Sequence, residues 1–471
     1  MAVLAGLVGP LAAGTGRASA EPGEDDLLDG VVFGGVTSPS PANITANPAA
    51  LVRTPAGLHV FALGGLRLDR IAIDRVQLAP GGATSAGPHV ADSTVGGAGV
   101  VGFTINPGNP VASFIVGWQP EERSIDRDAT AYQSRGDDGR IIEVAAALSF
   151  RVTTWLEVGG SVGYANHHQH VGFARDTALE AGDDPARGVG SDCGGAACGF
   201  EHPLAREEWS LDVATTSAFD DLLYSLGAIV RIADGVQLAL ATRRPWQLGL
   251  IPMDGTATIT EAPRDGGVVR HGEATVAARL PEIWRVGLRG RARPGWDALL
   301  ELRWRRLTRT GPYDVHTLGG DLAAADVPEW STRPRGLTEA FAAWVGAEQV
   351  DDGRRIRLGA WLGADSGATT NAKLSAAAPF GPVVAGAVGL QLRLSPSWRL
   401  QVGGQVRYQP STSTGTSAFD PQARRDCIAS GYDRELPACT TVRDGYGLPT
   451  AAGDYQRWSG GATVGLRIKV R

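Results

Sequence analysis

Apolar and polar residues alternate along several stretches of about ten residues, and aromatic residues often stand at the two ends. In WRLQVGGQVRY, from Trp398 to Tyr408, the apolar and aromatic residues fall on one side of an extended strand and the charged residues on the other. The same arrangement recurs from Trp296 to Trp304 and from Leu156 to Tyr164. In a transmembrane barrel the apolar face contacts lipid, the aromatic residues lie at both interfaces and the polar face lines the lumen. The pattern therefore predicts transmembrane β-strands.

The segments between these strands fall into two classes that alternate along the chain. Short turns lie at residues 106–110, 153–154, 233–235, 293–295, 351–353 and 395–397. Long polar connections lie near residues 79–94, 120–139, 166–208, 244–280, 308–338, 364–382 and 409–456. These thirteen connections predict fourteen strands, and an even number is typical of bacterial outer-membrane barrels. We therefore predict an all-β fold, with residues 57–471 forming a 14-stranded antiparallel transmembrane β-barrel.

The N-terminal residues divide into two segments before the first predicted strand. Residues 1–20 are mostly small and apolar and end in Ala18-Ser19-Ala20, which predicts a secretory signal peptide cleaved before Glu21. Residues 21–56 are rich in proline and small residues, and we expect them to form a plug in the lumen. The reason is that fourteen strands enclose a lumen too wide for side chains alone to fill. The alternative interpretation is a periplasmic leader.

The composition agrees with a barrel and narrows the possible functions. Charged residues make up 20% of the 471 residues and the mean hydropathy is -0.07, as expected where half of each strand faces water. The net charge of -6 argues against binding to nucleic acid. Since the sequence contains no nucleophile, paired-carboxylate or phosphate-binding motif, we expect no enzymatic activity and no cofactor. His167, His168 and His170 are interpreted as a solvated rim, and no metal site is predicted.

Four cysteines lie in two polar connections on the predicted outer side. Cys193 and Cys198 share one connection, and Cys427 and Cys439 share another. We expect each pair to form a local disulfide, although four cysteines allow three connectivities. Disulfides would agree with a compartment outside the cytoplasm.

Several short motifs resemble a known family. The N-terminal extension carries Asn47-Pro48-Ala49, a later hairpin begins with LPEIW at residues 280–284, and two further strands read WVGAE at residues 344–348 and RLGA at residues 357–360. Together with fourteen strands, these motifs resemble the FadL/TodX-type outer-membrane transporters of long-chain fatty acids and other hydrophobic compounds. The sequence departs from the family pattern at Gln349, where a tyrosine is usual, and at Arg471, where barrel proteins usually end in an aromatic residue.

The resemblance implies passive uptake of hydrophobic small molecules such as long-chain fatty acids. It implies that a plug carrying Asn47, Pro48 and Ala49 shifts, and that substrate leaves sideways through a gap at the third strand. Gly117 and Pro120 are our candidates for that gap, because both residue types weaken strand pairing.

The expected location is the bacterial outer membrane, as a monomer. The expected partners are a hydrophobic substrate, outer-membrane lipid and lipopolysaccharide, and the outer-membrane assembly machinery. Two alternatives remain: a water-filled, porin-like channel for polar solutes, and a structural or adhesive surface barrel.

Overall fold

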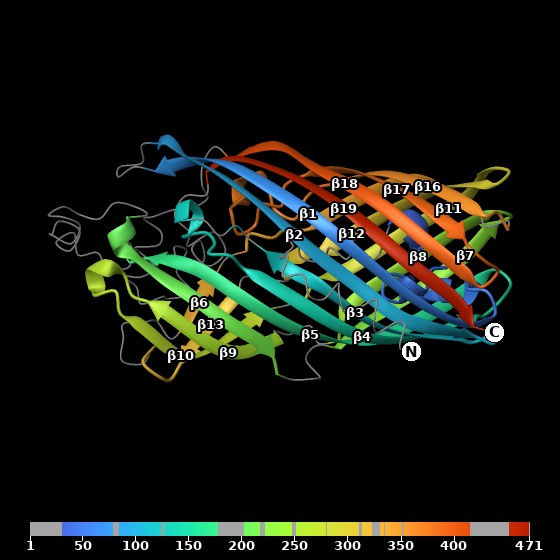
Figure 1. The fold of residues 1–471 in the computed structure, drawn as a ribbon, viewed down its shortest axis with the longest axis horizontal. Coiled ribbons are helices and arrows are strands. Elements are labelled where there is room, and N and C mark those ends of the chain that lie inside the picture. The colour runs from blue at the N-terminus through green and yellow to red at the C-terminus, as the bar shows by residue number, and fades with distance from the viewer. Residues whose placement is uncertain are drawn as a thin grey trace.

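The computed structural model describes residues 31–78, 84–123, 125, 128–177, 202–216, 222–246, 251–278, 280–309, 313–322, 330–333, 335–350, 353–414 and 452–470. These residues form a single sheet of antiparallel strands (Figure 1). The strands in its first part are β1 (Gly57–Leu78), β2 (Thr84–Asn106), β3 (Val111–Arg123), β4 (Asp138–Arg151), β5 (Leu156–Asp176), β6 (Arg206–Thr215), β7 (Leu222–Ala233), β8 (Val236–Pro245), β9 (Ile251–Thr260) and β10 (Val269–Ala278). The others are β11 (Glu282–Arg293), β12 (Trp296–Arg306), β13 (Tyr313–Leu318), β14 (Trp330–Arg333), β15 (Ala340–Gln349), β16 (Ile356–Asp365), β17 (Val383–Arg393), β18 (Trp398–Thr414) and β19 (Gly453–Val470).

These nineteen segments make fourteen barrel strands, because five barrel strands are each broken into two segments. The first half of β5 pairs with β7 and its second half with β6, so β6 and β7 together form one barrel strand. The same relation joins β8 to β9, β10 to β11, β12 to β13 and β14 to β15. Since β1 pairs with β19, the sheet closes on itself. The predicted 14-stranded antiparallel barrel is confirmed.

The outer surface near the short turns carries a band of exposed apolar side chains. On β18, Val402 and Val406 face outward between the exposed aromatic residues Trp398 and Tyr408. On β17, Val388 is 63% exposed. A closed barrel with an apolar band between aromatic ends is the architecture of a transmembrane β-barrel. Among the described residues, no helix is both long and apolar enough to cross a membrane.

The six predicted short turns lie between strands as expected. Two of them, Asp234-Gly235 and Pro294-Gly295, join β7 to β8 and β11 to β12. Both glycines adopt positive φ, 77° for Gly235 and 80° for Gly295, which residues with a side chain rarely adopt.

The predicted bounds of the long connections are partly wrong. Residues 244–280 contain β9 and β10, and residues 308–338 contain β13 and β14. In addition, β2 begins at Thr84 and β5 continues to Asp176. The reason is a reversal of polarity: on β9, Met253 and Ile259 are buried while Asp254 and Thr256 are exposed. A search for strands with an apolar outer face misses strands that are apolar on the inside.

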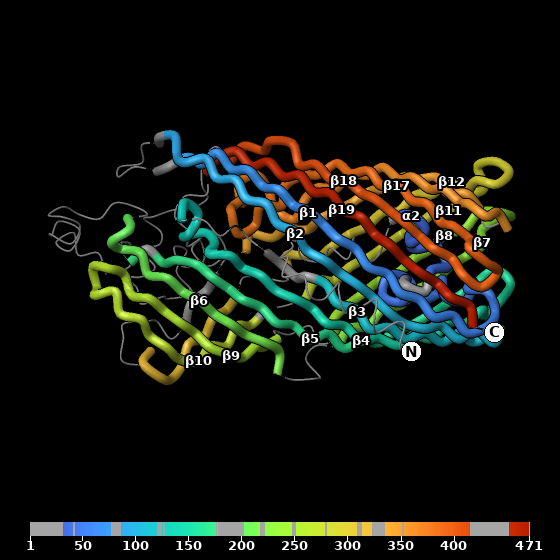
Figure 2. The backbone as a smooth tube through the Cα atoms, in the orientation of Figure 1, coloured from blue at the N-terminus to red at the C-terminus, as the bar shows by residue number. Residues whose placement is uncertain are grey.

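Residues 31–56, here called the inner segment, lie inside the barrel near the short turns, where Figure 2 labels α2. The segment contains α2 (Val31–Gly34) and the 3-10 helices η1 (Pro41–Ile44) and η2 (Pro48–Arg53). Its residues Ile44 and Leu51 are fully buried against β1 to β4. The other short 3-10 helices are η3 (Asp128–Thr130), η4 (Pro203–Ala205), η5 (Pro263–Asp265), η6 (Leu307–Arg309) and η8 (Asn371–Lys373).

Candidate functional site

The Asn47-Pro48-Ala49 motif begins η2 and lies directly against the barrel wall. The side-chain oxygen of Asn47 accepts the N–H of Ala49 at 3.1 Å, which caps the helix, and Pro48 occupies the first helical position. The Asn47 side-chain amide donates to the carbonyl oxygen of Val36 at 2.7 Å. The motif therefore links two parts of the inner segment to each other.

A pair of glycines on the wall makes room for this motif. Gly159 on β5 and Gly227 on β7 are directly opposite each other in the sheet. A Cβ atom at Gly227 would lie 1.8 Å from Oδ1 of Asn47, and one at Gly159 would lie 2.6 Å from the backbone nitrogen of Ala49. The glycine pair is thus a seat into which the backbone of the inner segment fits.

A second glycine pair holds the start of the inner segment. Gly359 on β16 and Gly389 on β17 are also directly opposite each other. A Cβ atom at Gly359 would lie 2.6 Å from Cγ1 of Val32, and one at Gly389 would lie 2.5 Å from the same atom. Both seats are formed by two inward-facing glycines in register, so the wall is shaped to the inner segment at two separate places.

Two buried carboxylates hold the main chain of the inner segment. Phe33 donates its backbone N–H to Oε1 of Glu348 at 2.7 Å, and Val36 donates to Oε2 of Glu301 at 2.9 Å. Phe33 has a φ of 61°, a left-handed conformation that costs a residue with a side chain about 1–2 kcal/mol. The guanidinium of Arg357 lies 4.9 Å from the centroid of the Phe33 ring. These contacts stabilise a conformation that the chain would otherwise avoid.

Charged side chains fill the lumen near the inner segment, and many of them pair with each other. Nη2 of Arg305 lies 2.7 Å from Oδ2 of Asp365, and Nη2 of Arg407 lies 3.7 Å from the same oxygen. Similar pairs join Arg243 to Glu143, Arg289 to Asp297, Arg303 to Glu301, and Arg457 to Asp69. Inward charges therefore neutralise one another at these places.

Arg53 links the end of the inner segment to the wall. Its guanidinium contacts the carboxylate of Glu157 and the side-chain oxygen of Gln237. Burial lowers the pKa of Arg53 below its usual value, and the nearby carboxylate of Glu157 opposes that effect. Arg53 is thus a partly buried cation whose charge is compensated by Glu157.

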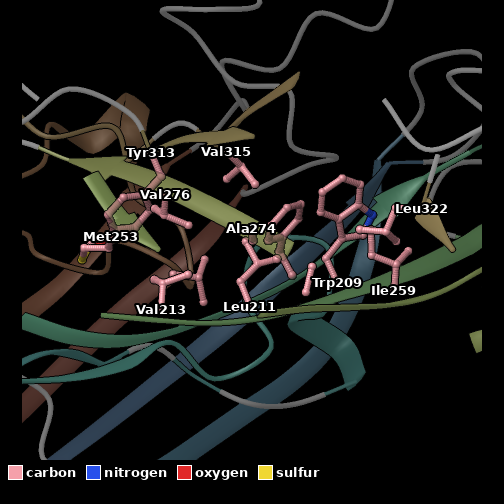
Figure 3. Packing of buried hydrophobic residues seen from close by; sticks show 13 residues of the cluster. Trp209, Leu211, Val213, Met253, Ile259, Ala274, Val276, Tyr313, Val315 and Leu322 are labelled. Atoms are coloured by element: carbon pink, nitrogen blue, oxygen red, sulfur yellow. The ribbon is translucent and has the colours of Figure 1, made fainter. Parts of the chain in front are cut away.

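The loop-end half of the lumen has the opposite character. Inward-facing side chains of β5, β6, β9, β10 and β13, together with Leu322 after β13, form one buried apolar cluster (Figure 3). The members of this apolar cluster are Val171, Phe173, Trp209, Leu211, Val213, Met253, Ala257, Ile259, Ala274, Val276, Tyr313, Val315 and Leu322. Most of these residues lie in stretches that the sequence pattern assigned to polar connections. The sequence signal that could have found them is alternation with the apolar side facing inward.

Two connecting segments fold against the inner wall in the same half. Leu374 and Ala376, between β16 and β17, pack with Ile125, between β3 and β4, and with inward residues of β1, β2 and β19. The backbone N–H of Ala376 donates to the side-chain oxygen of Gln133 at 2.8 Å. The two connections are thus bonded to each other inside the barrel.

Strand pairing stops partway along β2 and β3. The two strands pair from Ile105 opposite Ala112 to Gly99 opposite Trp118. Beyond that point β2 continues to Thr84 paired with β1, while β3 continues to Arg123 paired with β4. We call this place the β2–β3 seam.

The two residues predicted for a gap both lie at the β2–β3 seam. Gly117 is opposite Val100 in the next-to-last pair. Pro120 lies just beyond the last pair, where the register of β3 against β4 shifts. A proline cannot donate to the ladder, which fits the end of pairing here.

The remaining predicted residues divide between described and undescribed parts of the chain. Residues 1–30, with the predicted signal peptide, and all four cysteines lie outside the described residues. His167 is buried, whereas His168 lies on the opposite face of β5 and contacts Asp212 at 2.9 Å. Within the described residues, no group of three or more histidine, cysteine or acidic side chains is arranged to hold a metal ion.

Solved structures of known proteins share this fold. A Pseudomonas aeruginosa FadL homologue matches 97% of this chain over 100% of its own length, with a TM-score of 0.68 and 13% identity. The match with the Pseudomonas putida toluene transporter TodX covers 97% of this chain and 100% of TodX, with a TM-score of 0.62 and 12% identity. The match with the Ralstonia pickettii toluene transporter TbuX covers 96% of this chain and 99% of TbuX, with a TM-score of 0.59 and 11% identity. No protein-family model and no curated protein sequence matches the chain.

These structures match nearly the whole chain. At this level of identity the likeness concerns the arrangement of the backbone. The chain therefore has the fold of the FadL- and TodX-type outer-membrane channels.

Proposed function

We propose that the protein is a passive channel of the bacterial outer membrane that takes up hydrophobic small molecules. The observation that carries this proposal is the apolar cluster, whose side chains are buried inside the barrel on the side of the long connections. A hydrophobic molecule gains about 0.8 kcal/mol per buried CH2 group when it leaves water for such a surface. A wall of this kind can therefore extract a hydrophobic molecule from the outer leaflet without an energy source.

In this proposal the inner segment, within residues 21–56, is the plug of the lumen. Its two glycine seats and the carboxylates of Glu301 and Glu348 hold it across the short-turn half. Substrate then leaves sideways through the β2–β3 seam at Gly117 and Pro120, because the wall there lacks a complete ladder. Movement of the plug and opening of the seam are the two steps that release substrate.

The proposal includes the surroundings expected from the sequence. The barrel acts as a monomer, its exposed apolar band contacts lipid, and its loop-end rim faces lipopolysaccharide. The cysteine pairs Cys193–Cys198 and Cys427–Cys439 would stabilise outer connections in that compartment. The channel transports without chemical change, so we propose no enzymatic role.

Long-chain fatty acids are the cargo that we propose first, and binding to the refolded protein tests this. The informative variant is Val276→Thr with Val315→Thr, since these fully buried residues lie opposite each other on β10 and β13. Threonine keeps the shape of valine and adds a hydroxyl. We expect fatty acid affinity to fall about tenfold, or roughly 1.4 kcal/mol.

The control replaces outward residues of the same two strands, Ala277→Ser with Asp314→Asn, and should leave binding unchanged. A neutral long-chain alkane is measured beside the fatty acid. If the alkane binds and the fatty acid does not, the channel is hydrophobic but the cargo is wrong. If neither binds to the unaltered protein, the proposed function fails.

A further inference from the structure

One polar side chain, Gln169 of β5, is buried inside the barrel at the apolar cluster. It is 0% exposed and lies on the same face of β5 as Val171, a member of the cluster. In the sheet it is directly opposite Val213 of β6, which also belongs to the cluster (Figure 3). A fully buried amide among apolar side chains costs free energy unless its polar atoms are hydrogen-bonded. Gln169 therefore needs a partner at each end of its amide.

The amide nitrogen of Gln169 has such a partner across the cluster. Nε2 donates to the hydroxyl oxygen of Tyr313 on β13, a cluster member that is also buried. Along the wall, β6, β9 and β10 separate β5 from β13, so this hydrogen bond crosses the interior of the barrel. The guanidinium of Arg335 lies 4.4 Å from the centroid of the Tyr313 ring. Tyr313 thus fixes the direction of the amide.

The amide oxygen of Gln169 is the unpaired end. Among the residues that the structure describes, no group donates a hydrogen bond to the buried Oε1 atom. A buried acceptor without a donor costs about 1–3 kcal/mol. Most buried polar side-chain atoms in proteins are hydrogen-bonded, so an exception needs a physical explanation. Apolar surroundings with a few polar groups of fixed orientation are typical of small-molecule sites, where those groups give specificity.

We propose that Oε1 of Gln169 accepts a hydrogen bond from a hydroxyl group of the cargo. The cargo is then a hydrophobic molecule with a donating hydroxyl, such as an aliphatic alcohol, whose apolar chain packs against Val171 and Val213. An ionised carboxyl group cannot take this role, because it has no hydrogen to donate. This inference rests on the proposed uptake function, since the cargo reaches Gln169 only by entering the apolar cluster.

Equilibrium binding to the refolded full-length protein in detergent tests the cargo class. Octanol is compared with its isomer methyl heptyl ether, and binding to empty micelles is subtracted. The two molecules contain the same atoms, but only the alcohol can donate a hydrogen bond. A site that hydrogen-bonds a hydroxyl rejects an analogue without one, because its own polar group is then left unpaired. We expect octanol to bind at least about tenfold more tightly than the ether.

The outcomes separate this inference from the proposed function. Equal affinities for octanol and the ether would overturn the inference, since water alone would then serve Oε1, while uptake of hydrophobic molecules would stand. If neither molecule binds, the inference fails, and the fatty acid titration described above decides whether the proposed function fails with it.

The variant Gln169→Met tests the position of the group. Methionine is of similar length and apolar, so octanol affinity should fall about tenfold to that of the ether. Ether affinity should stay unchanged, which shows that the fold and the apolar cluster are intact. An octanol preference that persists in this variant would contradict the assignment. Weaker binding of the ether would also contradict it, because Gln169 would then support packing or donate to the cargo.

The matched control is Gln456→Met on the outer face of β19. Gln456 is exposed, and its Nε2 donates to the hydroxyl oxygen of Tyr408 at 3.0 Å. The control therefore removes the glutamine from the same pair of residue types on the opposite side of the wall. It should keep the full preference for octanol. Loss of the preference in the control would show that the effect does not come from the apolar cluster.

Discussion

Side chains alternate between the lumen and the outer surface in both halves of the barrel, but the apolar face is the outer one near the short turns and the inner one near the long connections. On β12, near the short turns, Glu301 and Arg303 are buried in the lumen while Leu302 is 46% exposed on the outside. On β10, toward the long connections, Val276 is buried in the lumen while Glu273 is exposed on the outside. The difference shows that the outer solvent, lipid in one half and water in the other, decides which face of a strand is apolar.

The breaks in the five middle strands mark where this polarity changes. Aromatic residues lie close to the breaks: Trp246 follows β8, Trp304 is near the end of β12 and Phe341 is near the start of β15. The rings of Trp304 and Phe341 stack with their centroids 6.2 Å apart. Since aromatic residues concentrate at membrane interfaces, we place the outer edge of the membrane at these breaks.

The largest expected effect concerns the buried charges around Asp365 in the lumen. Asp365→Asn leaves Arg305 and Arg407 without their shared carboxylate, and breaking a buried pair costs about 3–5 kcal/mol. Unfolding of the refolded protein in urea measures the loss. Glu273→Gln, at an exposed position in the loop-end half, should change stability by less than about 0.5 kcal/mol. If both substitutions lower the stability equally, the carboxylate of Asp365 contributes no more to the fold than the exposed carboxylate of Glu273.

A smaller effect is expected on the outer surface, where one substitution can be compared in both halves. Val388→Lys places a charge in the middle of the apolar band and should cost about 2–4 kcal/mol in lipid vesicles. Thr256→Lys, on the outer face of β9, should be tolerated within about 0.5 kcal/mol because that face contacts water. A large cost at Thr256 would place β9 inside the membrane and contradict the reversal of polarity.

The smallest effect concerns the seat of the inner segment. Gly227→Ala introduces a Cβ atom 1.8 Å from Oδ1 of Asn47, so the segment must shift. We expect ion conductance in planar bilayers to rise about tenfold, a change of roughly 1.4 kcal/mol in the balance between closed and open forms.

The control for this prediction is Gly160→Ala on the other face of β5. Its Cβ would meet Leu226 at an ordinary 3.5 Å, and conductance should stay unchanged. An unchanged conductance in Gly227→Ala as well would show that the seat does not hold the segment closed.

The sequence predicts the parts of this molecule that depend on local pattern. Turn residues and ten-residue alternation are sufficient to predict fourteen strands. Asn47, Pro48 and Ala49 were singled out, but their seat could not be predicted because Gly159 and Gly227 meet only through the pairing of β5 with β7. The apolar cluster was missed because the expected polarity of its strands was the reverse of the actual one.

The measurement that tests the account most directly is uptake by intact cells whose outer membrane contains the protein. A neutral hydrophobic fluorescent probe is compared with a polar solute of similar size, in the unaltered protein and in Ala98→Cys with Gln119→Cys. Ala98 and Gln119 come directly after the last pair, Gly99 opposite Trp118, so a disulfide between them, verified before the assay, closes the β2–β3 seam. Thr104→Cys with Ser113→Cys is the control in the paired half, where the two hydroxyls lie 2.9 Å apart.

The account predicts that the protein speeds uptake of the hydrophobic probe alone, and that closing the seam abolishes this gain while the control pair keeps it. Faster uptake of the polar solute, with the hydrophobic probe unaffected, would contradict the account and indicate a porin-like channel.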